Sequence, residues 1–524
     1  MDREKNLHGQ PPEADLSALA QCYEMTRAKR GNWEQLWQEA YEYALPQQNS
    51  FAFGNGKRAG SGRHDNLYDA TALDAAEQLA ASLLGNLTPP WSQWFGLKPG
   101  PDLNARETEA LAPVLEQAGK TMQAHFDRSN FIVEMHQCYL DLVVGGTAAL
   151  AFEEEEPGAL SAFKFTAIPL GDIVLEEGIN GTLSGSFRTL GLTLSQIKAR
   201  YPLAEIPSSI LQEGIQDAQR KFGVRESILP NEKGAFDFKA CLTESTQPVL
   251  LQEGRFPRSP MIAFRWLKAP GEIYGRSPVM KALPDIKTAN KVVELILKNA
   301  SIAVTGIWQA DDDGVLNPAN IELKPGSIIP KAVGSKGLTP LDMPGRFDIS
   351  QLILQDLRAR IRHALLTDRL GPIGGARMTA TEVLERSAEM ALLLGATYGR
   401  LQSELMTPLI QRAFNILRRR GEVPDINLDG RLVQLDYRAP LARAQGQRNI
   451  QNTLFWVESV LGMGGEATTA INLGATARFL GEALGVPSDL IKGAMPPIIN
   501  ETDNMEEQKN VSESNKTEKE QAGI

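Results

Sequence analysis

The chain has 524 residues, of which 42% are hydrophobic, so it can fill more than one structural unit with a buried core. Its 64 acidic residues outnumber its 54 basic residues and give a net charge of −10, which argues against a protein that wraps tightly around nucleic acid. The three cysteines lie far apart, and the sequence has neither a secretory signal nor a run of about 18 apolar residues. We therefore expect a protein of a reducing compartment, with no disulfide framework, no structural zinc and no membrane partner.

Helical spacing of apolar residues dominates the first 145 positions. Asn104 and Glu107 have the spacing of a capping box, and Gly85, Gly145 and Gly146 are placed to end helices. The pattern predicts four helices, over residues 15–45, 69–85, 104–126 and 131–144. Between the second and third, TPPWSQWF (88–95) predicts a rigid aromatic corner. This corner packs either within its own core or against a neighbouring unit.

The middle third of the chain has a different pattern of apolar and polar residues. From residue 147 to about 266, apolar and polar residues alternate, as in SAFKFTAI and GAFDFKACL. Alternation is typical of half-buried strands, so this region predicts antiparallel sheet. With the helices on either side, the chain is expected to be α+β and predominantly helical.

Two long helices are predicted after the sheet, over residues 277–303 and 346–369, with a small module of strand and turn character between them at 304–345. One face of the first helix carries Lys287, Lys291, Glu294 and Lys298. Such a stripe of charges is typical of a solvated face or of a seam of salt bridges.

A glycine-rich segment, LGPIGGARM, follows at 370–378 and predicts a loop. Its candidate functional residues are Gly371, Pro372, Gly374, Gly375 and Arg377. A capping box at Thr379 and Glu382 then predicts a long helix that ends at Arg420, before Gly421. The three arginines at 418–420 stand where cations stabilise the end of a helix. Shorter helices are predicted over 447–494, and the polar residues 501–524 predict a disordered tail.

Motifs for catalysis, cofactors and metals are absent from the sequence. GNGKRAG at 54–60 lacks the first glycine and the final Ser or Thr of a phosphate-binding loop, and ADDDG at 310–314 lacks the ligand spacing of a calcium loop. The five histidines form no metal-binding pair, and no G-x-S-x-G elbow occurs. We therefore expect a protein that is not an enzyme.

Five segments together resemble the portal, or head-to-tail connector, proteins of short-tailed phages. They are RGNWEQLWQEAYEYALP (30–46), YDATALDAAEQLAASLLGNLTPPWSQWFGL (68–97), GEIYGRSPVMKALPDIKTAN (271–290), MTATEVLER (378–386) and ELMTPLIQRAFNILRRRGEVP (404–424). The resemblance runs in order from about residue 20 to 445, and the set is more specific than any single segment.

The resemblance implies a dodecameric ring at one capsid vertex, built from subunits with several named parts. By analogy these parts are a wing (1–276), two stem helices (277–303 and 346–369), a clip (304–345), a tunnel loop (370–378), a long helix with a return to the wing (379–445), a crown (446–500) and a tail (501–524).

The function implied is a conduit for double-stranded DNA during packaging and ejection. The implied partners are further copies of the chain, the major capsid and scaffolding proteins, the terminase large subunit and tail adaptor proteins. The expected location is the virion, after assembly in the host cytoplasm. A negative lining would let DNA slide, because strong phosphate binding would hold it in place. If the resemblance holds, Lys287, Lys291 and Lys298 are candidates for transient contact with DNA phosphates, and the alternatives are the solvated face or a seam of salt bridges between subunits. The arginines at 418–420 could likewise meet DNA or simply stabilise their helix end. The alternatives are another ring-forming virion protein, such as a tail adaptor or internal core protein, and, less favoured, a DNA-packaging enzyme.

Overall fold

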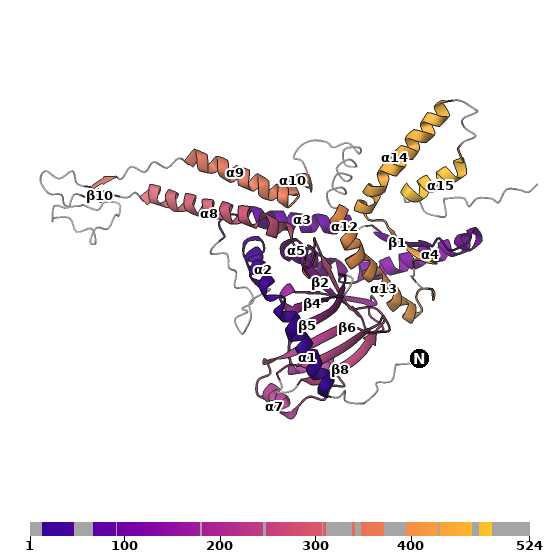
Figure 1. The fold of residues 1–524 in the computed structure, drawn as a ribbon, viewed down its shortest axis with the longest axis horizontal. Helices are drawn as coiled ribbons and strands as arrows, with labels where there is room; N and C mark the ends of the chain where they lie inside the picture. Colours follow the sequence, from indigo (N-terminus) through magenta and orange to yellow (C-terminus); the bar gives the residue numbers. More distant parts are fainter. Residues whose placement is uncertain are drawn as a thin grey trace, which may run out of the picture.

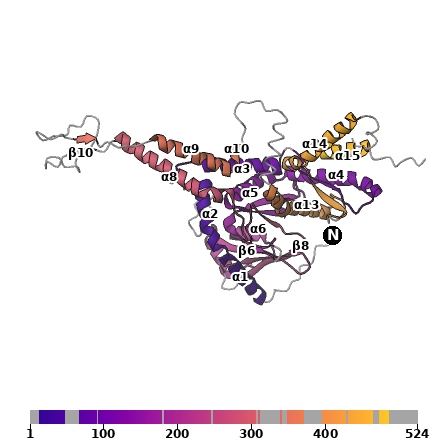
Figure 2. The same cartoon turned by 45° about the horizontal axis from the view of Figure 1, so that its top comes forward.

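A body of helices and antiparallel sheets carries two helical projections, which leave it in different directions (Figures 1 and 2). This arrangement confirms the α+β, predominantly helical class. The computed structural model describes residues 13–46, 67–90, 92–178, 181–244, 248–305, 308–310, 338–340, 347–370, 395–426, 428, 430–463 and 471–484.

The N-terminal helix predicted over 15–45 is two helices, α1 (Glu13–Ala28) and α2 (Gly31–Ala44). The break lies at Arg30, whose side chain is buried and donates hydrogen bonds to the carbonyls of Ile173 (2.6 Å) and Gly171 (2.9 Å). The prediction of one helix was therefore wrong, because a tertiary contact of Arg30 and the weak helix propensity of Gly31 outweigh the apolar spacing.

The next three helices follow the prediction closely. In α3 (Thr71–Leu87) the helix passes through Gly85, which was expected to end it, and stops only before Pro89 and Pro90. The helix α4 (Ala105–Arg128) begins with the predicted capping box of Asn104 and Glu107. The last of the three, α5 (Phe131–Gly145), ends at Gly146 in the left-handed conformation, with φ of 73°.

Two antiparallel sheets form the middle third, as predicted. The smaller sheet has the order β3-β2-β9, and the larger has the order β4-β5-β6-β7-β8. Their strands are β2 (Thr147–Glu154), β3 (Phe163–Ile168), β4 (Ile173–Glu177), β5 (Leu183–Thr193), β6 (Lys221–Pro230), β7 (Phe236–Leu242), β8 (Val249–Phe256) and β9 (Met261–Arg265). Two short helices that the sequence reasoning missed, α6 (Leu194–Arg200) and α7 (Ser208–Gln216), share a second core with the larger sheet.

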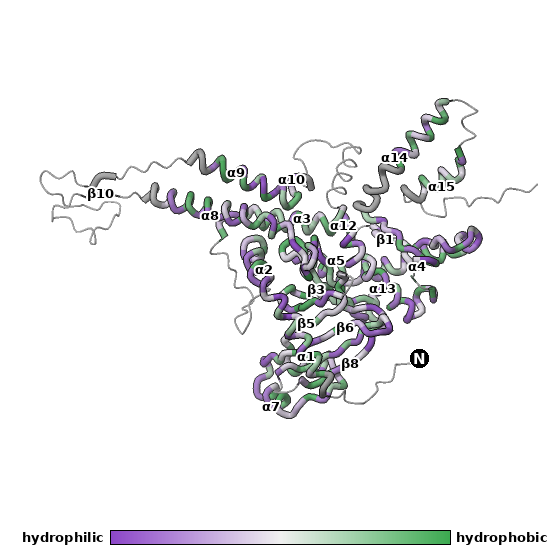
Figure 3. The backbone as a smooth tube through the Cα atoms, viewed as in Figure 1, coloured by the Kyte–Doolittle hydropathy of each residue, from purple (hydrophilic) through white to green (hydrophobic). Residues whose placement is uncertain are grey.

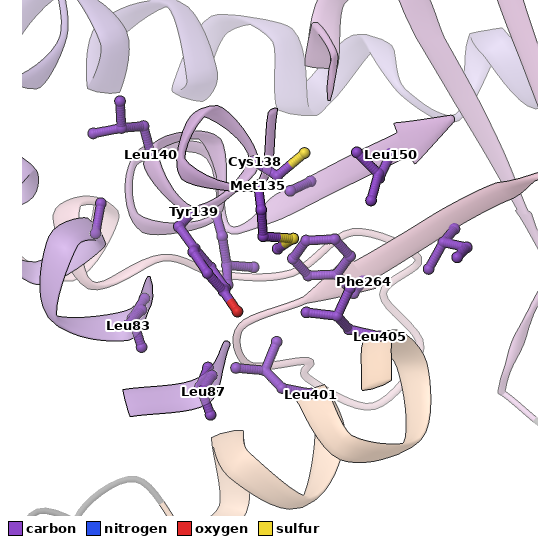
Figure 4. Packing of buried hydrophobic residues seen from close by; sticks show 14 of the residues in the cluster. Leu83, Leu87, Met135, Cys138, Tyr139, Leu140, Leu150, Phe264, Leu401 and Leu405 are labelled. Atoms are coloured by element: carbon purple, nitrogen blue, oxygen red, sulfur yellow. The ribbon is translucent and has the colours of Figure 1, made fainter. Parts of the chain in front are cut away.

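The main core is organised around α5, most of whose side chains are buried. Figure 4 shows Tyr139 and Met135 of this helix on the side of the leucines from α3 and from the helical segment at 401–405. Cys138 points instead toward β2, where its thiol lies 3.5 Å from the carbonyl of Ala149. An aromatic group extends the same core: the ring of Trp94 lies 4.6 Å from that of Phe95, and 5.6 and 6.1 Å from those of Phe126 and Phe131. The aromatic corner thus packs inside its own chain at Trp94 and Phe95, while Trp91 lies outside the described residues.

The first projection is a hairpin of two long helices, α8 (Pro278–Thr305) and α9 (Phe347–Ala364) (Figure 1). Near its tip the short strands β10 (Trp308–Ala310) and β11 (Leu338–Pro340) pair antiparallel. The second helix was predicted to reach residue 369, but a turn at Leu366, whose φ is 60°, separates α9 from the short α10 (Thr367–Leu370). That predicted helix was therefore too long.

The helix predicted over 379–420 is described only from Gly395. Its described part comprises α12 (Gly395–Leu401), a π turn (Gln402–Met406) and α13 (Thr407–Arg420), which ends as predicted before Gly421, with φ of 73°. The uniform helix that was predicted is wrong here, because Pro408 cannot continue a regular α-helical hydrogen-bond pattern. The chain then returns to the body, where β12 (Val433–Tyr437) pairs with β1 (Phe95–Pro99).

The second projection comprises α14 (Pro440–Gly462) and α15 (Leu473–Leu484). Figure 3 shows hydrophobic residues gathered in the body around α5 and also present on the projecting α14. Phe455 of this helix is 73% exposed, and Met463, directly after its last residue, is 75% exposed. Apolar surface is therefore left uncovered at this end of the chain.

Candidate functional site

The root of the α8–α9 hairpin is fixed to the body by polar contacts on both helices. From α9, the guanidinium of Arg358 reaches the carboxylate of Asp69 at 2.7 Å. From α8, the side-chain oxygen of Asn290 accepts hydrogen bonds from the backbone N–H groups of Tyr68 (2.7 Å) and Asp69 (3.1 Å). These contacts hold the hairpin against the segment that leads into α3.

Asp69 is the central acceptor at this root and is itself buried. Burial alone would raise its pKa, but hydrogen bonds from Thr71 and Arg358 outweigh burial and hold the pKa below the ordinary 3.8. The carboxylate is therefore charged at neutral pH and available to Arg358. A second pair, Arg360 with Asp285 at 2.9 Å, joins α9 directly to α8.

The lysine stripe on α8 is paired within the chain. Lys287 reaches Glu39 of α2 at 2.6 Å, while Lys291 and Lys298 both reach Glu294, at 2.9 and 2.6 Å. Hydrogen bonds from Lys298 and Lys291 lower the pKa of Glu294. Lys287 thus helps to anchor α8, whereas Lys291 and Lys298, each with a side chain 63% exposed, keep their ammonium groups at the surface. Contact of these lysines with DNA stays a prediction.

The arginines at the end of α13 also have partners in the body. Arg419 and Arg420 both bind Glu154 of β2, at 2.7 and 2.9 Å, and Arg418 lies 3.7 Å from Asp425. The sequence suggested DNA contact or helix-end stabilisation as their role. The geometry adds a third role, which is to attach the end of α13 to the three-stranded sheet.

The predicted channel loop lies outside the described residues. This applies to all five of its candidate residues, Gly371, Pro372, Gly374, Gly375 and Arg377. The elements on either side are described: α10 lies beside α3, and α12 enters the core through Tyr398 and Leu401. The loop prediction thus stands as it was, between two elements that are both attached to the body.

One buried ionic site was not anticipated from the sequence. Glu404, in the π turn, accepts hydrogen bonds from the guanidinium of Arg265 at 2.6 Å and from its backbone N–H at 3.0 Å. Arg265 ends β9 and is entirely buried. The one local signal that could have pointed here is Pro408, which marks an irregular turn in an otherwise helical pattern.

No cluster of three or more His, Cys, Asp or Glu side chains suited to a metal ion occurs within the described ranges. The acidic turn at 310–314 and the basic loop at 54–60 lie largely or wholly outside those ranges. None of the helices in the described part of the chain combines the length and the apolar character needed to cross a membrane.

Two phage proteins that are similar to this chain are both portal proteins, one of them by probable assignment. The chain is 24% identical to the portal protein of Salmonella phage epsilon15, over 91% of this chain and 89% of that protein. It is also 24% identical to the probable portal protein of Bordetella phage BPP-1, over 84% of this chain and 81% of that protein. Among solved structures, it is similar to a chain of the virion of a native gene transfer agent particle, with a TM-score of 0.34 and 12% identity, over 78% of this chain and 89% of that one.

Residues 16–491 match the family described as bacteriophage head to tail connecting protein. Such a match covers most of the sequence and includes the body, both projections and the π turn. It confirms the resemblance to portal proteins of short-tailed phages. The chain therefore belongs to the bacteriophage head-to-tail connecting protein family and forms the connector at the capsid vertex.

Proposed function

We propose that twelve copies of the chain form a closed ring and that double-stranded DNA passes through its centre during packaging and ejection. The observation that carries this proposal is the α8–α9 hairpin, which leaves the body as two long helices with paired short strands near its tip (Figure 2). In portal proteins, two helices on either side of a small module build the stem and clip around the channel. The net charge of −10 supports passage of DNA without tight binding.

The parts of the subunit are assigned accordingly. The body is the wing, α8 and α9 are the stem, the module with β10 and β11 is the clip, and α14 with α15 belongs to the crown. The clip and the crown lie on different projections, so tail adaptors and capsid contents would meet different ends of the ring. The terminase large subunit, the major capsid protein and the scaffolding protein are the other proposed partners. Assembly takes place in the host cytoplasm, and the ring itself hydrolyses no nucleotide.

Imaging of the purified protein tests the ring directly. Negative-stain electron microscopy should show a ring with a central hole, and mass photometry should give about twelve times the 57.3 kDa of one chain. A compact monomer at micromolar concentration would contradict the proposal. Nucleotide hydrolysis that co-purifies with the ring and disappears in Lys57→Ala would contradict the absence of catalysis.

The channel loop is proposed to comprise Gly371, Pro372, Gly374, Gly375 and Arg377, on the sequence pattern alone. Glycine adopts backbone conformations that proline excludes, so Gly374→Pro with Gly375→Pro should restrict this segment. We expect normal ring yield but less DNA packaged or retained per particle. A normal amount of DNA per particle through packaging and storage would remove the channel-loop assignment.

A further inference from the structure

The helix from Gly395 to Arg420 changes its hydrogen-bond pattern at the π turn. The backbone N–H of Thr407 bonds the carbonyl of Gln402, five residues earlier instead of four. Pro408 accounts for the position of this turn. Proline has no N–H, and in a regular α-helix its ring would collide with the carbonyl of Glu404. The wider turn accommodates Pro408 without ending the helix.

Side chains from the body hold the π turn in place. The hydroxyl of Thr407 lies 2.8 Å from the carbonyl of Gln402 and 2.7 Å from the hydroxyl of Tyr437 on β12. The carboxylate of Glu404 is held by both the backbone and the side chain of Arg265. The turn is therefore bound to two different strands of the body.

Arg265 joins this turn to two further segments. Its guanidinium donates to the carbonyl of Ile273 (2.8 Å), which lies five residues before α8, and to the carbonyl of Gly181 (3.1 Å), in the turn between β4 and β5. It also lies 3.3 Å from Glu177, which pairs in addition with Lys268. Burial would raise the pKa of Glu177, but hydrogen bonds from Lys268 and Arg265 outweigh it and keep the pKa low.

The rotation of α12 about its axis depends on this turn. A π turn holds one residue more than the same length of α-helix, so closing it to α-helix would turn α12 by about 100° and shift it by about 1.5 Å. With α13 held in the body, each residue of α12 would then move to the place that its predecessor now occupies. Exposed Gly399 would take the buried place of Tyr398, and buried Leu401 the half-exposed place of Arg400. Figure 4 shows Leu401 and Leu405 beside Phe264, in the packing that this rotation would disrupt.

We propose that Arg265 is a positioning residue that locks the rotational register of α12, by holding Glu404 in the π turn and joining that turn to the segment before α8. Pro408 favours the π turn through its own ring geometry, and Arg265 holds the π turn even when Pro408 is replaced. The assignment of α8 to the stem and of α12 to the long helix of a portal subunit rests on the proposed function. The register lock itself does not depend on it.

A spin label on Gly399→Cys reports the register, because the space next to Gly399 is open and the residue is exposed. Cys22→Ser removes the one cysteine that is not buried, since Cys138 and Cys241 are buried. The mobility of the label is measured by electron paramagnetic resonance on the full-length protein, with every variant in the same assembly state. In the labelled Gly399→Cys, Cys22→Ser variant, with no further change, the label is expected to be mobile.

Pro408→Ala alone should leave the label mobile, because Arg265 still holds the turn. Pro408→Ala combined with Arg265→Met should immobilise it and lower the mobile fraction by about tenfold. The matched control is Pro408→Ala with Arg412→Met, because Arg412 is a buried arginine on α13 that donates to the carbonyls of Phe152 (2.7 Å) and Arg258 (2.9 Å). This control should keep the label mobile. A general loss of packing would affect both double variants alike.

Two outcomes would overturn the proposal. One is immobilisation by Pro408→Ala alone, which would make the proline sufficient to set the register. The other is a mobile label in the folded Pro408→Ala, Arg265→Met variant. If that variant fails to fold, Pro408→Ala with Glu404→Gln decides in its place, because glutamine keeps the shape of Glu404 but not its charge. Since the measurement does not require a ring, failure of the lock is distinguishable from failure of the proposed ring.

Discussion

The body and the two projections differ in how completely they bury their large apolar side chains. In the body, Trp94 is 1% exposed and packs against three aromatic rings, whereas Phe455 on α14 is 73% exposed and Leu352 on α9 is 69% exposed. One chain thus completes a large core in its body, although single apolar side chains such as Leu160 (86% exposed) and Leu203 (77% exposed) also reach the body's surface. On the projections, large apolar side chains remain uncovered on helices that contribute far fewer of the described residues to this core than the body does. The body therefore draws its stability from within, while the projections expose surface of the kind that protein contacts cover. Neighbouring copies in the proposed ring would supply such contacts.

The largest expected effect comes from removing a tryptophan from the body. Trp94→Ala should lower the free energy of unfolding by about 3–5 kcal/mol, because it deletes a large, fully buried side chain from a packed aromatic group. Trp456→Ala, on the 47% exposed tryptophan of α14, is the matched control. Chemical denaturation of the two variants in the same assembly state measures the difference. Equal destabilisation by both changes would contradict the expectation that buried apolar side chains of the body contribute more to stability than exposed ones of the projection.

The next effect concerns a buried acid in the body. The hydroxyl of Tyr41 donates to Asp141 at 2.6 Å, and burial raises the pKa of Asp141 from 3.8 to about 7. Between pH 3.8 and about 7, the folded protein keeps a proton that the unfolded chain releases. The free energy of unfolding should therefore fall with rising pH in this range, by about 1.4 kcal/mol per pH unit.

Asp141→Asn should remove that slope, because the amide still accepts the Tyr41 hydrogen bond but has no proton to lose. Relative to the wild type, the variant should gain stability as the pH rises from 5 to 8. The measurement is the free energy of unfolding at several pH values. Parallel profiles for variant and wild type would show that Asp141 ionises normally in the folded protein.

A smaller effect is expected at the root of the α8–α9 hairpin. Arg358→Met removes the cation that holds buried Asp69, and should cost about 1–2 kcal/mol, because a charged hydrogen bond to a buried group is lost. Arg360→Met is the control, since the side chain of Arg360 is 58% exposed and its pair with Asp285 should contribute less than about 1 kcal/mol. Hydrogen exchange at the base of α8 and α9 would localise the change. Equal exchange in the two variants would argue against Asp69 as the anchor.

The stability that the Asp69–Arg358 contact contributes should change with pH in the opposite direction from that of the Asp141 site. The pKa of Asp69 is lowered, so its contribution is complete above its ordinary pKa of 3.8 and is lost as the pH falls through the lower folded value. The Arg358→Met variant should therefore differ most from the wild type at neutral pH and converge with it in acid. Asp141 acts across a higher pH window and with the opposite sign.

The smallest effect is expected on the exposed face of α8. Lys291→Gln with Lys298→Gln should leave the melting temperature unchanged, because both side chains are largely solvated and share one carboxylate. Lys287→Gln, which breaks a contact with α2, should lower it slightly. Differential scanning fluorimetry separates the two cases. A marked loss of stability in the double variant would place these lysines in a structural contact.

Local signals in the sequence were sufficient for most secondary structure. The capping box at Asn104 and the end of α5 at Gly146 were predictable because each depends on only a few adjacent residues. The alternation in the middle third predicted antiparallel strands for the same reason. Local reasoning failed at Gly85, where the helix continues to two prolines, and at Pro408, whose effect within a long helix was overlooked.

The sequence by itself thus determined the fold class, the family and those helix ends that depend on a local cap, such as Asn104 and Gly146. Only the tertiary structure decided which charges meet: Lys287 with Glu39, Arg420 with Glu154, and Arg265 with Glu404. It also decided that Trp94 completes its own core and that β1 pairs with β12 more than 300 residues away. The physical reason is distance along the chain. Caps, turns and periodicity act over a few residues, whereas ion pairs and core contacts depend on how remote segments are brought together.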